Sequence, residues 1–129
     1  MNCWFWNIDR DRQEFFYREL QVSRLRQGWG YQEDLNLRTI QQQKEADEPI
    51  TDRQEAAWSR CHYMLDQIKP GDLAVVKNVP SGDHFTLVKI TGDYDFAISD
   101  ETSDQGHILP VDVIGTFHKN ARTVQTPMV

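Results

Sequence analysis

Residues 68–94 read IKPGDLAVVKNVPSGDHFTLVKITGDY, and this stretch decides the fold class. Two runs of β-branched and aromatic residues, 73–79 and 85–91, flank the segment PSGD at 80–83. Such runs, bounded by Pro, Gly and Asp, are typical of strands joined by turns. We therefore expect two strands here, and a tight hairpin at 91–94 that leads into a further strand at 94–99.

Upstream of this stretch, Thr51 and Gln54 have the spacing of a capping box, which is a signal for a helix N-terminus. Apolar residues follow at spacings of three and four as far as residue 68, where Lys-Pro-Gly ends the pattern. We expect a helix over 51–68 whose buried stripe includes Trp58 and Cys61.

The remaining segments complete an α+β order. Residues 2–8 alternate as a strand does, with Trp4 and Trp6 on one face. The sequence also predicts helices at 11–22 and 34–43, a short strand at 24–30, a polar loop at 41–48 and a strand at 111–118. We expect one domain over 1–120, a small, partly closed antiparallel β-barrel flanked by two or three helices, and a loose tail at 121–129.

The composition excludes several classes of protein. The 129 residues include 14 Lys and Arg against 20 Asp and Glu, and a net charge of −6 argues against coating DNA or acidic membrane by bulk charge. Two cysteines do not make a disulfide framework, and their spacing matches no zinc pattern. No apolar run approaches the roughly 20 residues that span a bilayer. We expect a cytoplasmic protein with no membrane partner, no metal and no cofactor.

Catalytic motifs are scarce. Cys61 and His62 are neighbours on the expected helix and therefore do not face one another. The segment Asp104-Gln105-Gly106-His107 could bring a carboxylate to an imidazole, which leaves a small hydrolase or nuclease as one alternative. A loop that precedes a strand explains the same residues without chemistry. We expect no enzyme and assign no catalytic residue.

The aromatic residue that stands out is Trp29, because Gly28 and Gly30 flank it and Tyr31 follows. Glycines let a backbone turn sharply or approach a ligand closely, and aromatic walls are how proteins hold a planar ligand or a flipped base. Arg24 and Arg26 alternate along the run before it, so on a strand both would point to one face, where arginine can pair with phosphate.

The order of these features resembles the PUA-like superfamily, and within it the EVE and YTH-like readers of modified bases. It is most similar to the EVE-like modules at the N-terminus of some McrB-type restriction proteins. The resemblance rests on the aromatic first strand, on Gly28-Trp29-Gly30 after the first helix, and on Gly92-Asp93-Tyr94 at the start of a barrel strand. It covers roughly residues 2–118.

This resemblance implies a pocket for one nucleic-acid base of DNA or RNA, often modified, with Trp29 as one aromatic wall. The opposite wall would come from Tyr94, Phe96 and the loop 100–107, and Asn7 could hydrogen-bond the base edge. The expected base-pocket residues are Trp29, Tyr31, Trp6, Asn7, Tyr94, Phe96 and His107. The expected phosphate contacts are Arg24, Arg26, Lys77 and Lys89.

The resemblance also implies a role in restriction or defence, with an effector protein or a fused effector domain as a candidate partner. The alternative from another class is a protein-interaction or regulatory module on the same barrel, which the acidic second half of the chain favours.

Overall fold

A computed structural model describes residues 1–99 and 101–120, so the tail expected at 121–129 lies outside the described residues. The chain forms two compact units, each assembled from segments that are distant in sequence. The first unit contains Met1–Leu25, Lys69–Thr91 and the segment from Val111; the second contains Arg26–Ile68 and Gly92–Pro110.

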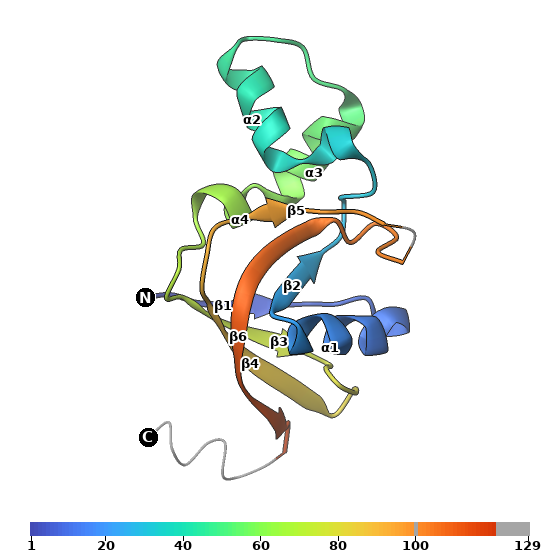
Figure 1. Ribbon diagram of the computed structural model, residues 1–129, viewed down its shortest axis with the longest axis vertical. Coiled ribbons are helices and arrows are strands. Elements are labelled where there is room, and N and C mark those ends of the chain that lie inside the picture. The colour runs from blue at the N-terminus through green and yellow to red at the C-terminus, as the bar shows by residue number, and fades with distance from the viewer. Residues whose placement is uncertain (100, 121–129) are drawn as a thin grey trace. The chain divides into compact units, whose positions relative to one another are not determined.

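The first unit is built on a curled, partly open mixed sheet (Figure 1). Its strands run in the order β1 (Cys3–Trp6), β3 (Leu73–Lys77), β4 (His84–Ile90) and β6 (His107–His118), of which the part from Val111 belongs to this unit. The prediction of a wholly antiparallel sheet is wrong, because β1 pairs in parallel with β3. More than sixty residues separate these two strands, which is ample for the crossover that a parallel pair requires.

One face of this sheet forms the hydrophobic core of the first unit. Helix α1 (Gln13–Gln21), which a 3-10 turn at Arg10–Arg12 precedes, contributes an apolar stripe with the spacing that the sequence predicts. The next strand, β2 (Arg24–Gln27), begins beside β6, where the Val111 N–H donates to the Ser23 carbonyl oxygen over 3.1 Å. The buried apolar residues of this unit are Trp6, Phe15, Phe16, Leu20, Leu25, Ala74, Val76, Val79, Val88, Ile90 and Val111.

Asp72 fastens the start of β1 to the segment before β3. Its carboxylate accepts from the Asn2 N–H, the Trp4 Nε1–H and the Lys69 N–H, each over 3.0 Å. These donors, the Asn2 N–H above all, lower the pKa of Asp72 to about 2. Trp4 is thus held at the sheet by a hydrogen bond and Trp6 is in the core, so both residues have structural roles.

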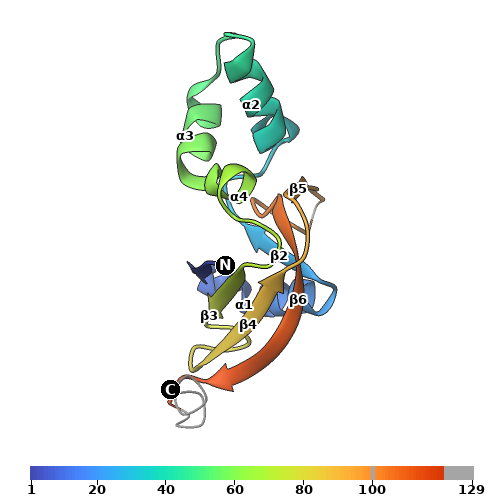
Figure 2. The same cartoon turned by 90° about the vertical axis from the view of Figure 1, so that its left-hand side faces the viewer.

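The second unit is mainly helical (Figure 2). It contains α2 (Leu37–Glu45), α3 (Asp52–Cys61), α4 (Tyr63–Asp66) and β5 (Asp95–Phe96), which pairs with the first residues of β6. The capping box at Thr51 and Gln54 is confirmed in both directions. The single helix predicted for 51–68 is instead divided into α3 and α4 at His62. There the Leu65 N–H donates to the His62 carbonyl oxygen over 2.9 Å, which is the shorter hydrogen-bond spacing of a 3-10 turn.

The hairpin predicted at 91–94 is wrong. Strand β4 pairs with β3 and β6, whereas β5 is only two residues long and pairs with His107 and Ile108 of β6. Strands β4 and β5 each pair with the long strand β6 and not with each other. Gly92-Asp93 therefore connects two strands without forming a hairpin.

The acidic and basic residues are distributed unevenly between the two units. Among the described residues, the first unit carries eight Lys and Arg against seven Asp and Glu, whereas the second carries five against twelve. The net charge of the described residues is therefore +1 on the first unit and −7 on the second. Within the described residues, no helix combines the length and the apolar character needed to cross a membrane.

Candidate functional site

The candidate site is Trp29 in the second unit. Its side chain is 41% exposed, although its backbone has a φ of 70°, a conformation that costs a non-glycine residue about 1–2 kcal/mol. The Gly30 N–H donates to the Asp104 carbonyl oxygen over 2.8 Å. A Cβ atom added at Gly106 would lie 2.2 Å from the Gly30 carbonyl oxygen, so the two glycines are needed for this close backbone approach.

A series of three hydrogen bonds connects the start of α2 to the backbone of Trp29 and holds that backbone in place. The Leu37 N–H donates to the Tyr94 hydroxyl over 3.1 Å, and this hydroxyl lies 2.7 Å from His107 Nδ1. His107 Nε2 lies 3.1 Å from the Trp29 carbonyl oxygen. Because a carbonyl oxygen only accepts, Nε2 carries the proton and Nδ1 accepts from Tyr94. Leu37, Tyr94 and His107 therefore each donate in the same direction, from the start of α2 to the Trp29 carbonyl oxygen, which accepts the last hydrogen bond.

Burial fixes the protonation states of His107 and Tyr94 in this series of hydrogen bonds. His107 is 0% exposed, and burial lowers its pKa to about 4 despite the opposing effect of its bond to Trp29. Burial also raises the pKa of Tyr94. Both groups are consequently neutral around pH 7, and neither ring nitrogen of His107 is free to bind a ligand.

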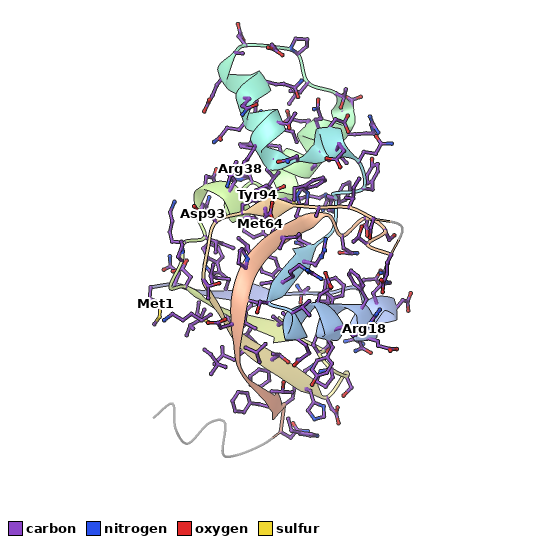
Figure 3. All side chains as sticks on the ribbon, in the orientation of Figure 1. Met1, Arg18, Arg38, Met64, Asp93 and Tyr94 are labelled. Atoms are coloured by element: carbon purple, nitrogen blue, oxygen red, sulfur yellow. The ribbon has the colours of Figure 1, made fainter. Side chains whose placement is uncertain are left out.

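The other predicted residues of this unit are brought to the same place. Phe96 packs edge-on against His107 with ring centroids 5.4 Å apart, and its ring lies against Gly30 and Gly106. Arg38 donates to the Tyr94 carbonyl oxygen over 2.9 Å, and the two residues lie together in Figure 3. Tyr31 is 41% exposed. Tyr94, Phe96 and His107 thus support the Trp29 loop, while Trp29 and Tyr31 face solvent.

Two arginines complete this site. The guanidinium of Arg60, on α3, lies 4.5 Å from the centroid of the Trp29 ring, which is a cation–π contact. Arg26 is buried, and its Nη1 donates to the carbonyl oxygens of Ala97 and Gln105 over 2.8 and 3.0 Å. Arg26 therefore holds the two ends of the 97–105 loop together.

The remaining predicted residues belong to the first unit. Trp6 is buried and Asn7 is exposed. Arg24 donates from Nε and Nη2 to both carboxylate oxygens of Glu19, over 2.9 and 2.8 Å. Lys77 on β3 and Lys89 on β4 lie on the same face of the sheet.

The predicted environment of α3 is partly wrong. Trp58 is half-buried and stacks on His62 with centroids 5.6 Å apart, so it is not in the core. The buried residues of α3 are Gln54, Ala57 and Cys61. Cys61 is a buried free thiol, as predicted, and burial raises its pKa to about 12. A thiol in this state is not a nucleophile.

The pair Asp104 and His107 does not form. Both ring nitrogens of His107 are engaged by Tyr94 and Trp29, and Asp104 Oδ1 accepts from Gln105 Nε2 over 2.5 Å. The geometry therefore gives no support to the hydrolase alternative built on these two residues.

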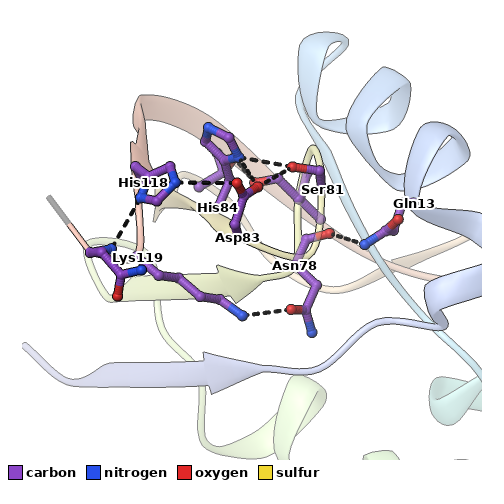
Figure 4. A network of polar contacts seen from close by, with 10 residues as sticks. Gln13, Asn78, Ser81, Asp83, His84, His118 and Lys119 are labelled. Atoms are coloured by element: carbon purple, nitrogen blue, oxygen red, sulfur yellow. Dashed lines mark hydrogen bonds and ion pairs between the residues drawn. The ribbon is translucent and has the colours of Figure 1, made fainter.

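Another group of polar residues, in the first unit, has the composition of a catalytic triad (Figure 4). Ser81 Oγ and Asp83 Oδ1 lie 2.8 and 2.7 Å from the same atom, His84 Nδ1, and 2.6 Å from each other. In a triad the nucleophile and the acid lie at opposite ring nitrogens. This cluster instead closes the turn between β3 and β4, and His118 on β6 joins it through Asp83 over 3.2 Å.

Within residues 1–99 and 101–120, no group of three or more His, Cys, Asp and Glu side chains is arranged to hold a metal ion. Comparison with models of known protein families gave no match, and no curated protein matched the sequence.

The sequence pointed to Trp29 and to its neighbours Tyr94, Phe96 and His107, although not to their supporting role, and it did not point to Arg60 or Gly106. Arg60 carries no local signal, because its contact with Trp29 joins residues 31 positions apart. The signal for Gly106 was its residue type, because a glycine at this position permits the close contact with the Gly30 backbone. Its role nonetheless depends on a backbone contact between distant segments.

Proposed function

We propose that this chain is a nucleic-acid-binding module of the PUA-like kind, in which the second unit accepts a flipped base against the indole of Trp29. The observation that carries the proposal is an exposed tryptophan on a strained, tightly supported backbone. Left-handed non-glycine residues cluster where strain serves function, because the surrounding structure must stabilise them. Here the support comes from His107 and from the contact between Gly30 and Gly106.

Stacking supplies the energy that such a site needs. Extruding a base costs a few kcal/mol, and stacking on an aromatic ring is worth about 1–3 kcal/mol. Arg60 beside the indole adds a guanidinium, a group that both stacks on bases and pairs with phosphate. A modified base is the expected ligand, and a fused or associated effector would convert its recognition into restriction or defence.

The charge of the second unit limits how the ligand is held. With twelve acidic against five basic residues among those described, this unit does not attract a polyanion by bulk charge. Affinity at Trp29 must then come mainly from stacking, and its dependence on salt should be shallow.

The same charge favours a second candidate, a protein-interaction module that takes a basic partner. A lysine-rich peptide would bind the acidic unit with an affinity that falls steeply with salt. Oligonucleotides with modified and unmodified bases therefore have to be compared with such a peptide over a range of salt concentrations.

The test uses isothermal titration of oligonucleotides that carry methylated or unmodified cytosine and adenine. We expect Trp29→Ala to weaken binding about tenfold or more, and Trp29→Phe to retain part of the affinity. Trp58→Ala is the matched control, because Trp58 is the other half-exposed tryptophan of this unit and stacks only within the helical region. No binding by the wild type, or equal losses in Trp29→Ala and Trp58→Ala, would refute the proposal.

A further inference from the structure

The sheet of the first unit has a second face, which lies opposite the core. The strand registers place three rows of side chains on it: Cys3, Leu73 and Lys89; Phe5, Val75 and Leu87; and Lys77, Phe85 and Phe117. We call this surface the outer face. None of these nine residues is buried, whereas Trp6, Ala74, Val76, Val88 and Ile90 on the other face are all buried.

The composition of the outer face is unusual for a surface. A sheet with one face in solvent normally alternates apolar and polar residues, with the polar ones outward. Here apolar side chains occupy most outward positions, and Phe5 is 69% exposed. Large exposed apolar areas with charged neighbours mark interaction sites.

Three of these side chains are phenylalanines with defined neighbours. The Lys77 ammonium lies 5.2 Å from the centroid of the Phe5 ring. Phe85 and Phe117 are cross-strand partners whose centroids lie 5.4 Å apart at 30°. A Cβ atom at Gly115 would lie 3.0 Å from the Phe117 ring, so the glycine leaves room for that ring to lie on the sheet.

We propose that the outer face binds single-stranded nucleic acid, with its phenylalanines stacking on bases and Lys77 and Lys89 contacting phosphates. Rings interleaved with cations on an exposed sheet are what a single strand requires, since every base has a stacking face and every nucleotide a charge. The charge balance selects this occupant. The described residues of the unit that carries the outer face have a net charge of +1, the opposite sign to the whole chain, and Lys77 and Lys89 lie on the face itself. One carboxylate opposes it, because Asp112 is the cross-strand neighbour of Lys89.

This proposal does not rest on Trp29, which belongs to the second unit, and the two can fail separately. A base stacked on Trp29 requires one nucleotide and gives a shallow salt dependence. A strand on the outer face requires several nucleotides and gives a steeper one, about 0.7 in the slope of log affinity against log salt for each phosphate contact.

The experiment is fluorescence anisotropy with the full chain and labelled oligothymidylate or oligouridylate of about a dozen nucleotides, a length within known single-strand site sizes. We expect Phe5→Ala to weaken binding about tenfold. We expect Lys77→Gln with Lys89→Gln to reduce the salt slope by about 1.4. Val22→Ala and Lys44→Gln are matched controls, because Val22 is an exposed apolar residue outside the outer face and Lys44 lies in the second unit. Both should bind as the wild type does.

Three results would overturn the proposal. The first is no binding of either oligonucleotide, or binding that Phe5→Ala and the lysine pair leave unchanged. The second is equal affinity for a duplex of the same length, because paired bases cannot stack on the rings. The third is a wild-type dimer in sedimentation that Phe5→Ala converts to a monomer, which would assign the face to a second copy of the chain. Unchanged circular dichroism and urea midpoint of Phe5→Ala establish that any loss is local.

Discussion

His107 Nε2 donates to the carbonyl oxygen of Trp29 across 3.1 Å, joining a fully buried ring to the backbone of an exposed tryptophan 78 positions earlier in the chain. This bond requires the neutral ring with its proton on Nε2, since Nδ1 accepts from Tyr94. The geometry of the candidate site consequently depends on the protonation state of a residue that does not reach the surface.

The first prediction is a loss of stability in mild acid. His107 has its pKa lowered to about 4, whereas the unfolded chain has the ordinary value of 6.5. The unfolded state therefore binds more protons between these values, and stability is complete above about pH 6.5 and falls as the pH drops to 4. The difference corresponds to about 3 kcal/mol. Urea unfolding at a series of pH values measures it.

The variant His107→Gln provides the control for this pH dependence. It removes the titrating ring, so its free energy of unfolding should change less between pH 6.5 and 4 than that of the wild type. Asp72 and Asp83, whose pKa values are lowered to about 2 by their hydrogen-bond donors, lose their contributions only below about pH 4. A variant with the full wild-type pH dependence would show that His107 is not its source.

The second prediction concerns Tyr94→Phe. Removal of the hydroxyl leaves the Leu37 N–H and His107 Nδ1 without their partner in a buried region, which should cost about 1–3 kcal/mol of unfolding free energy. Tyr63→Phe is the comparison, because the Tyr63 hydroxyl accepts from Gln27 Nε2 at a less buried position. Chemical denaturation at pH 7 should rank Tyr94→Phe as the more destabilised, and the reverse order would contradict the hydrogen-bond chain.

The third prediction concerns the glycine contact. Gly106→Ala puts a Cβ atom 2.2 Å from the Gly30 carbonyl oxygen, and relief requires the backbone to move, at a cost of about 3 kcal/mol. Gly82→Ala meets nothing within 4 Å and should change the midpoint little. Thermal unfolding of the two variants tests the contrast. Equal midpoints would show that the two backbones do not approach as closely as described.

The fourth prediction separates the stability of Trp29 from its function. Trp29→Gly relieves a left-handed residue, worth about 1–2 kcal/mol, and loses the contact with Arg60, worth about 0.5–1 kcal/mol. Its unfolding free energy should thus equal or slightly exceed that of the wild type, while ligand binding is lost. Trp6→Ala, a core truncation, should instead lose about 3–5 kcal/mol. A large destabilisation of Trp29→Gly would make the indole a structural residue.

Local sequence signals predicted the elements that depend on neighbouring residues. The capping box at Thr51, the buried stripe of α1 and the strands β3 and β4 all formed within a few residues of their expected positions. Their causes act over a single turn or along one strand, so the sequence contains them in full.

Predictions that needed a distant partner were less successful. Gly92-Asp93 has the residue types of a hairpin turn, but the strands on either side of it, β4 and β5, both pair with β6 instead of with each other. Trp58 follows the spacing of a buried stripe, yet its ring stacks on His62 at the boundary of the core. Periodicity identifies which residues share a face, whereas burial depends on what packs against that face.

The sequence by itself determined the α+β class, the candidate tryptophan and the total charge, because each follows from residue identity or local spacing. Only the tertiary structure decided that Arg26 and His107 are buried supports, and that the charge of −6 divides into a slightly basic and a strongly acidic unit. The physical reason is the same in each case. Hydrogen bonds and packing join distant segments of the chain, as Arg26 and Gln105 show across 79 positions, and no local pattern encodes such a contact.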